Sequence, residues 1–211
     1  KADRSIRGGT FHSVALSFLR EHSDEWKMMR GCGKEPSIIE EHQKKTIFSG
    51  LIRSRLEDFL GIPSDTIQWL ACAANREKAR KYKGFTLIEK SLAELMTEYD
   101  RYKRANSVVD FDDLIHDLTE LIKKSSRVGA SISHYRYLFI DEFQDIADST
   151  LSLVKELLPL TGGNLCAVGD DAQAIYSFMG SVPDHILSFQ THFPGARIHR
   201  LTENYRSHAE I

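Results

Sequence analysis

The spacing of apolar residues predicts helices through the first half of the chain. Four of them recur at the i, i+3, i+4, i+7 positions of an amphipathic helix: Phe11, Val14, Ala15 and Phe18. This helix follows a Gly-Gly-Thr turn, and the glycines at 31 and 33 end the region. The chain is therefore expected to begin with a helix that buries one face.

Residues 36–106 have the pattern of an all-helical segment. A capping box, SIIE from Ser37, begins one helix, whose apolar positions run to Phe59 and whose length allows a break within it. The sequence predicts a second helix over Asp65 to Tyr82. A capping box TLIE from Thr86 begins a third, with apolar residues at alternating spacings of four and three.

The pattern changes beyond residue 130, after a further helix that Asp110 is placed to cap. Three short runs rich in β-branched and aromatic residues predict strands: Tyr135–Ile140, Leu165–Val168 and Ala196–Leu201. Two segments between them predict helices: Asp148–Leu158 and Pro183–Phe193. Strands separated by helices imply a parallel sheet with right-handed crossovers, so the predicted fold class is α/β.

Composition is that of an ordinary globular protein, with 211 residues, 41% hydrophobic residues and a net charge of −2. No apolar run approaches the roughly 20 residues that span a bilayer, so we expect a cytoplasmic protein with no membrane partner. The cysteines Cys32, Cys72 and Cys166 show no paired spacing, which indicates buried thiols and neither disulfides nor zinc.

The small net charge of the whole chain conceals a local excess of basic residues. Residues 36–106 hold 13 Lys and Arg against 10 Asp and Glu, a net charge of +3, which leaves −5 for the rest. The excess lies mainly in Asn75–Lys83 and Arg101–Arg104. Two readings stay open for these segments: contact with nucleic-acid phosphates, or a solvated helix face.

A pair of carboxylates follows the first predicted strand of the sheet. Asp141 and Glu142 come directly after the apolar run YLFI, and ligands of parallel sheets collect at the carboxyl ends of strands. Such a pair suits phosphoryl transfer: Asp141 can hold Mg²⁺, and Glu142 can position and deprotonate an attacking water. The alternative is that Asp141 merely caps the following helix.

Two further polar clusters follow the other predicted strands. In GDDAQAIYSFMG, Gln173 is placed to read a terminal phosphate, and Tyr176 and Phe178 are placed to stack on bases or to fill a core. In TENYRS, Arg206 is placed either to stabilise phosphate charge or to form a surface ion pair.

Five motifs run along the chain from Gly9 to Ser207: GTFHSVALSFLREH, VVDFDDLI, DEFQD, VGDDAQAIYSF and LTENYRS. In this order they resemble the UvrD/Rep/PcrA-like group of superfamily 1 DNA helicases. The resemblance implies an incomplete RecA-like P-loop NTPase parallel sheet with an inserted all-helical subdomain. Residues 1–22 and 107–211 would belong to the first motor domain, and residues 23–106 to the insert.

On the nucleotide side, the resemblance implies ATP and Mg²⁺ as cofactors. Asp141 would coordinate the metal and Glu142 would activate water. Gln144 and Gln173 would couple the nucleotide state to DNA, with Gln144 and Asp170 among the nucleotide-binding residues. The same group implies that Tyr205 stacks on adenine and Arg206 reaches the γ-phosphate.

On the DNA side, the resemblance implies backbone contact by Thr10 and His12 and stacking of Tyr176 and Phe178 on successive bases. Stacking tolerates every base, which suits a motor that is indifferent to sequence. The implied partners are single-stranded DNA, junctions of single and double strands, and the rest of a helicase chain. The implied function is ATP-dependent 3′ to 5′ movement and unwinding in DNA repair, replication or recombination.

Two departures from the family pattern limit this expectation. No segment fits G-x-x-x-x-G-K-[ST], the loop that cradles the β- and γ-phosphates; GCGK at 31–34 lacks the strand before it and the Ser or Thr after it. Met179 also stands where the family usually has arginine. We therefore expect a piece of a longer helicase that is inactive alone. A non-catalytic DNA-binding or interaction module is the alternative, and a nuclease-linked helicase is a third possibility.

Overall fold

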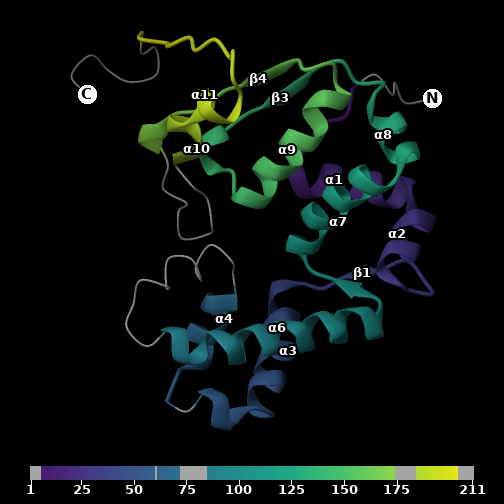
Figure 1. Cartoon of the computed structure of the whole chain (residues 1–211), viewed down its shortest axis with the longest axis vertical. Helices are drawn as coiled ribbons and strands as arrows, with labels where there is room; N and C mark the ends of the chain where they lie inside the picture. The colour runs from purple at the N-terminus through teal and green to yellow at the C-terminus, as the bar shows by residue number, and fades with distance from the viewer. Residues whose placement is uncertain (1–5, 60, 72–84, 174–183, 204–211) are drawn as a thin grey trace.

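The computed structural model describes residues 6–59, 61–71, 85–173 and 184–203. Figure 1 shows two parts along the longest axis of the molecule. The lower part, which we call the helical unit, consists of α3 (Glu41–Arg53), the 3₁₀ turn η1 (Leu56–Phe59), α4 (Ser64–Ala71) and α6 (Phe85–Asn106). The other described helices and the longer sheet form the larger part.

Five helices and two strands make the frame of the larger part. The helices are α1 (Phe11–Glu21), α2 (Ser23–Arg30), α7 (Phe111–Lys124), α8 (Ser126–Ile132) and α9 (Asp148–Leu160), and the strands are β3 (Leu138–Ile140) and β4 (Leu165–Ala167). Shorter elements complete it: η2 (Phe143–Asp145), η3 (Asp171–Gln173), α10 (Asp184–Leu187) and α11 (Phe189–His192). Helices and small parallel sheets together are those of an α/β protein, as the sequence predicts.

Helix α1 begins where the sequence predicts, because Thr10 caps it. The Thr10 hydroxyl accepts a hydrogen bond from the Ser13 amide at 3.2 Å, which satisfies one of the free donors of the first turn. Its buried face carries Ala15, Phe18 and Leu19 and packs against α7. This packing holds α1, the segment for which the resemblance implies DNA contact, against α7 in the middle of the larger part.

The apolar interior of the larger part has two clusters. The first joins α1, α2, α7, α8 and α9 around fully buried Trp26. The second lies under β3 and η2, and contains Ile140, Phe143 and Val154. Phe11 packs against both clusters, so α1 touches the base of the sheet. The helical unit has an apolar cluster of its own, around Phe48, Leu95 and Tyr99.

Two short strands that the sequence pattern did not reveal join the two parts. β1 (Ser37–Ile38) and β2 (Val108–Val109) pair in parallel, and hydrogen bonds from Ser37 N to Ser107 O (3.0 Å) and Ile39 N to Val109 O (2.9 Å) extend the ladder. The chain enters the helical unit through β1 and leaves it through β2. Strands of two residues are too short to show an alternating pattern, so the sequence does not predict them.

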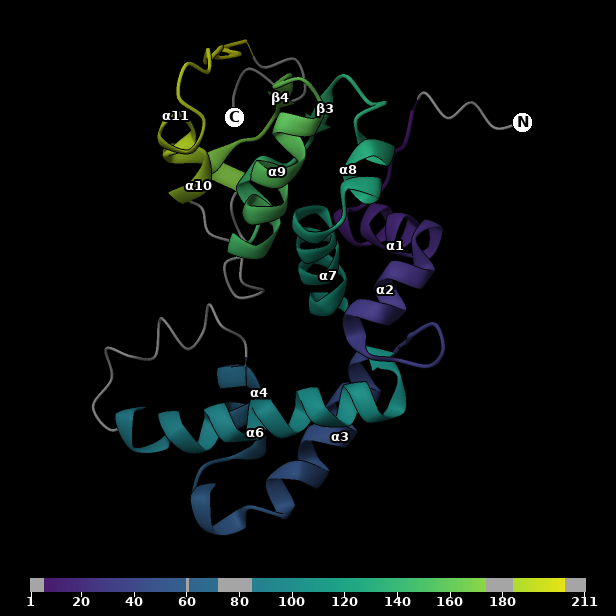
Figure 2. The ribbon, with the colours of Figure 1, turned by 45° about the vertical axis from the view of Figure 1, so that its right-hand side comes forward.

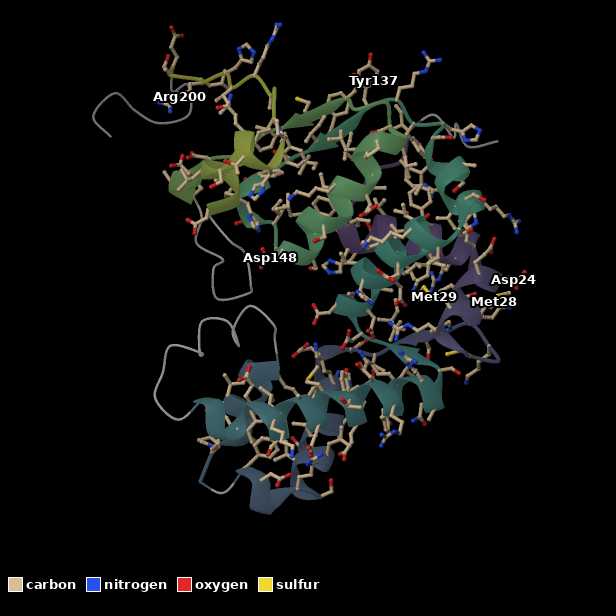
Figure 3. The ribbon with its side chains drawn as sticks, viewed as in Figure 1. Asp24, Met28, Met29, Tyr137, Asp148 and Arg200 are labelled. Carbon is tan, nitrogen blue, oxygen red and sulfur yellow. The ribbon has the colours of Figure 1, made fainter. Side chains whose placement is uncertain are left out.

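The β3–β4 sheet is parallel, with Leu138 opposite Leu165 and Ile140 opposite Ala167. In both Figures 1 and 2, α9 lies along one side of this sheet. The opposite face is open: Phe139 is 74% exposed, and Figure 3 shows Tyr137 pointing outward from the sheet. The sheet therefore has one buried face and one exposed apolar face.

Several sequence expectations fail at element boundaries. Ser37 does not cap a helix, because it pairs in β1; Glu40 and Gln43 form the capping box of α3 instead. Helix α6 begins at Phe85 and so already includes Thr86. The helix expected from Pro183 is divided at Ser188 into α10 and α11.

The third predicted strand, Ala196–Leu201, is not formed in the described part of the chain. Leu201 is 94% exposed, and the segment joins neither edge of the β3–β4 sheet. A strand is stable only where a neighbour supplies hydrogen bonds, so its apolar pattern alone does not produce one.

Candidate active site

The carboxylate pair lies at the carboxyl end of β3, as its sequence position predicts. Asp141 and Glu142 are both exposed. Asp141 Oδ1 accepts a hydrogen bond from the amide of Glu142 at 3.0 Å, and the first residue of α9 is preceded by Ala147 at the N-cap. Asp141 therefore does not cap the following helix, and that alternative is wrong.

Glu142 adopts a left-handed backbone conformation, with φ of 52° and ψ of 47°. This region is unfavourable for residues with a Cβ by about 1–2 kcal/mol, so its neighbours must hold it. The adjacent backbone does so: Phe143 N donates to Val168 O at 2.9 Å, and Asp145 N donates to Glu142 O at 2.9 Å. The result is a sharp turn that projects Glu142 from the end of the sheet.

Gln144 is 1% exposed and links the ends of the two strands. Its Nε2 donates to Glu142 Oε2 at 2.6 Å, and its Oε1 accepts from the backbone amide of Asp170 at 3.0 Å. Both functional atoms of the amide are thus used. Rotation of the amide would break both bonds, so the site fixes one orientation of the side chain.

Gly169 is the position that allows this approach. A Cβ on Gly169 would lie 2.7 Å from Gln144 Oε1, 2.9 Å from Ile186 Cδ1 and 3.1 Å from the Phe143 amide nitrogen. The first two distances are shorter than real Cβ contacts. The sequence showed Gly169 as part of a cluster but gave no sign that its missing side chain is a requirement, because the neighbour comes from 25 residues earlier.

Asp170 extends the hydrogen-bonded chain into the loop after β4. Its Oδ1 accepts from the amide of Ala172 at 3.0 Å, and its Oδ2 accepts from Gln173 Nε2 at 2.7 Å. A continuous path therefore runs from Glu142 through Gln144 and Asp170 to Gln173. Four of the residues that the sequence singled out for nucleotide chemistry are connected.

Thr10 and His12 lie at the N-terminal end of α1. The His12 ring contacts Phe111 of α7 edge to face, with the ring centroids 5.8 Å apart. Burial lowers the pKa of His12 below its ordinary value, and the carboxylate of Asp112 opposes that shift. Phe111 is half exposed beside it. No local pattern in the sequence indicates the exposure of Phe111 or its contact with His12.

Four of the expected site residues lie outside the described residues: Tyr176, Phe178, Tyr205 and Arg206. Met179, where the sequence departs from the family pattern, lies there too. The whole of the basic segment Asn75–Lys83 also falls outside them. Their roles rest on sequence alone.

The donor set at the end of β3 fits Mg²⁺. One oxygen of each carboxylate already accepts a hydrogen bond within the protein: Asp141 Oδ1 from Glu142 N, and Glu142 Oε2 from Gln144 Nε2. The other oxygens, Asp141 Oδ2 and Glu142 Oε1, bond no described residue and belong to an exposed turn. Mg²⁺ prefers one or two carboxylates completed by waters and phosphates, so this pair supplies what the ion requires from protein. The described residues contain no group of three or more metal-ligating side chains.

Two expectations about side chains are wrong. At Lys103, in the basic segment Arg101–Arg104, both alternatives fail, because this residue is 3% exposed and bonds Asp113; Arg101 and Arg104 are exposed, and for them both alternatives stay open. Cys166 is exposed on the open face of the sheet and is not a buried thiol. In both cases the pattern of one segment did not reveal what another segment would cover.

A search against protein families matches the UvrD/REP helicase N-terminal domain over residues 3–194. The chain belongs to this helicase family. Across the part that the structure describes, this helicase domain has no helix both long and apolar enough to cross a membrane.

Relatives of this helicase domain cover nearly the whole chain. The putative ATP-dependent DNA helicase YjcD of Bacillus subtilis (strain 168) is 42% identical over 210 residues, which are 97% of this chain and 26% of that protein. The ATP-dependent DNA helicase PcrA of Leuconostoc citreum is 30% identical over 99% of this chain and 28% of its own length. The chain therefore spans about a quarter of the length of these relatives.

Proposed function

We propose that this chain is part of an ATP-dependent DNA helicase or translocase that moves 3′ to 5′ on single-stranded DNA and unwinds duplexes in repair, replication or recombination. One observation carries the proposal: the hydrogen-bonded path from Glu142 through Gln144 and Asp170 to Gln173. The relatives named as ATP-dependent DNA helicases support the choice of ATP and DNA as ligands.

In this proposal the end of β3 performs the hydrolytic step. Asp141 holds Mg²⁺, which neutralises phosphate charge when bound. Glu142 orients a water molecule and accepts its proton as the water attacks the terminal phosphate. The left-handed turn supports this role, because it projects the Glu142 carboxylate while Gln144 restrains one of its oxygens.

The same path couples the nucleotide to DNA. Loss or movement of the terminal phosphate changes the position of Glu142 or Gln173, and the buried amide of Gln144 transmits that change between the strand ends. Gln173 is three residues before Tyr176, which together with Phe178 we assign to base stacking. Tyr205 and Arg206 keep the adenine and γ-phosphate roles that the family pattern implies.

DNA contact at the start of α1 completes the assignment. We assign Thr10 and His12 to the DNA backbone, and the partners are single-stranded DNA, its junctions with duplex, and the rest of the helicase chain. We also propose that the larger part is an incomplete RecA-like motor domain and the helical unit its insert. Trp26 packs in the cluster of the larger part, which favours a boundary after α2 and not at residue 23. The expected location is the cytoplasm.

Met179 in place of the family arginine favours one other function, a DNA-binding module without coupled hydrolysis. The two functions differ in one respect: only the helicase hydrolyses ATP in a DNA-dependent manner.

The test uses a full-length helicase that contains this chain. We expect DNA-stimulated ATP hydrolysis and unwinding of a duplex with a 3′ single-stranded tail, and much less unwinding with a 5′ tail. DNA binding without hydrolysis would favour the binding module, and preference for the 5′ tail would reverse the polarity. The 211-residue chain alone is expected to bind single strands weakly, in a salt-sensitive manner, and to hydrolyse no measurable ATP.

A further inference from the structure

Charged side chains from four helices meet where the helical unit joins the larger part. We call this group the ionic junction: Arg30 of α2, Lys44 of α3, Lys103 of α6, and the N-cap Asp110 with Asp113 and Asp117 in the first half of α7. Figures 1 and 2 both show the helical unit meeting the rest of the molecule at this end, where β1, the end of α6 and the start of α7 lie.

Asp113 is shared between the two parts. From the larger part, Arg30 Nη2 lies 2.9 Å from Asp113 Oδ1. From the helical unit, Lys103 Nζ donates to both Asp113 oxygens at 2.8 Å. The side chains of Lys103, Arg30 and Asp113 are 4%, 9% and 12% exposed. One nearly buried carboxylate therefore holds a cation from each side.

The larger part anchors its side of the junction through Asp117. Asp117 Oδ2 accepts from Arg30 Nε at 2.6 Å and from the indole nitrogen of Trp26 at 2.7 Å. Burial raises the pKa of Asp117, against the opposing effect of Arg30. Arg30 is thus held from two directions and presents its other nitrogen to Asp113.

The helical unit anchors its side through Asp110, the N-cap of α7. Its Oδ2 accepts from the Tyr99 hydroxyl at 2.9 Å, and the ammonium groups of Lys44 and Lys103 lie 3.5 and 3.6 Å away. Burial acts to lower the pKa of Lys103, but Asp110 and Asp113 outweigh it and raise that pKa, so the lysine stays charged. The junction is therefore a continuous ionic network across the boundary.

Among the described residues, the other contacts across this boundary include the hydrogen bonds of the two-residue β1–β2 ladder, the ion pair of Lys44 with Asp112 and apolar packing. Ile38 and Val109 pack against the cluster of the larger part, whereas Ile39 and Val108 pack against the cluster of the helical unit. A ribbon with two residues per strand does not resist bending, and apolar contact has little dependence on angle. A fixed angle requires directional bonds beyond this short ladder, and the ionic junction supplies them among the described residues.

We propose that Asp113 is a positioning residue that holds the helical unit at one angle to the larger part, with Arg30 and Lys103 as its two anchors. Buried ion pairs add little net stability compared with apolar groups, but they can specify one geometry among several. This role goes beyond ATP hydrolysis and does not depend on it. A change at the junction can also affect the DNA-contact segment, because Phe111, next to the Asp110 cap, contacts His12.

The test measures the distance between two spin labels by pulsed electron resonance in the 211-residue chain. Labels at Ser54→Cys on the helical unit and Ser152→Cys on α9 report the angle, after the three native cysteines are replaced by serine. We expect a single narrow distribution in the parent protein. The Lys103→Met substitution should broaden it about twofold, because the helical unit loses its anchor.

Two controls separate positioning from general destabilisation. Arg55→Met removes the same charge from ion pairs confined to the helical unit, with Asp58, Glu94 and Glu98, and should leave the width unchanged. Labels at Met28→Cys and Ser152→Cys, both in the larger part, should stay narrow in every variant. If Lys103→Met does not fold, Asp113→Asn is measured in its place. An unbroadened distribution in whichever variant folds, or equal broadening by Arg55→Met, would overturn the proposal.

Discussion

Oε2 of Glu142 lies 2.6 Å from Nε2 of Gln144, so the catalytic candidate is held by an amide that is buried beneath it. The same amide accepts a hydrogen bond from the backbone of Asp170. The carboxylate at the end of one strand is therefore tied to the loop that follows the next strand. This link gives the family motifs DEFQD and GDDAQ a physical connection within one site.

Substituting Gln144 by methionine should destabilise the chain by about 1–3 kcal/mol. Methionine has a similar length, but it removes two hydrogen bonds of a buried side chain, one to the Glu142 carboxylate and one from the Asp170 amide, and each is worth about 0.5–1.5 kcal/mol or more where a charge takes part. Urea unfolding followed by circular dichroism measures the change. Gln190→Met is the matched control, because Gln190 is exposed and bonds only the carbonyl of Ala196. Equal stability of the two variants would show that the path from Glu142 to Asp170 is not formed.

Gly169→Ala should be destabilising by at least about 1 kcal/mol, because a Cβ there meets Gln144 and Ile186 at less than 3 Å. The comparison is Gly50→Ala at the start of the last turn of α3, where a Cβ meets nothing within 4 Å. That change should be stabilising by about 0.5–1 kcal/mol, since alanine favours helix. Thermal unfolding of both variants shows whether each substitution lowers or raises the stability. A neutral Gly169→Ala would mean that the loop after β4 moves away from Gln144 at no cost.

Glu142→Gly should be more stable than Glu142→Ala by about 1 kcal/mol. Both substitutions remove the carboxylate and its bond to Gln144, so they differ only in the cost of a left-handed backbone. Chemical denaturation of the pair isolates that cost. If alanine were equal to or more stable than glycine at this position, the turn would not be left-handed in solution.

The affinity of the chain for single-stranded DNA should rise as the pH falls from about 7.5 to 5.5, across the ordinary histidine pKa of about 6.5. Burial holds the pKa of His12 below that value, so the ring is neutral at neutral pH and gains charge only in acid. A phosphate beside it favours the protonated form, and linkage then requires tighter binding at low pH.

Fluorescence anisotropy with a labelled oligonucleotide measures this dependence at constant ionic strength. His12→Gln should reduce the gain in affinity between the two pH values, whereas His134→Gln should not, because His134 is an exposed residue outside the DNA-contact segment. An identical gain in the parent protein and in His12→Gln would remove His12 from the DNA interface.

Helices and the strand-end site were predictable because their signals are local. Thr10 and Asp110 cap helices within three residues of their partners, and YLFI followed by two carboxylates marks a strand end in one segment. The α/β class follows from such segments in alternation. Their positions relative to one another follow from the parallel pairing of β3 and β4.

Features that depend on distant segments were not predictable. Lys103 belongs to a basic run in sequence, but the carboxylate that buries it comes from α7. Ala196–Leu201 has the pattern of a strand, but it pairs with neither β3 nor β4. Gly169 is required by the side chain of Gln144, which lies on another loop. In each case the structure of a segment depends on a distant segment, which the local sequence pattern does not include.

The most direct test of the central claim is the rate of DNA-stimulated ATP hydrolysis by the Glu142→Gln variant of a full-length helicase that contains this chain, measured together with its ATP affinity. Glutamine keeps the size of the side chain but cannot accept a proton from water. We predict that hydrolysis falls by about 10²–10⁴-fold while ATP affinity is retained. Hydrolysis at the rate of the parent protein would contradict the assignment of Glu142 as the base.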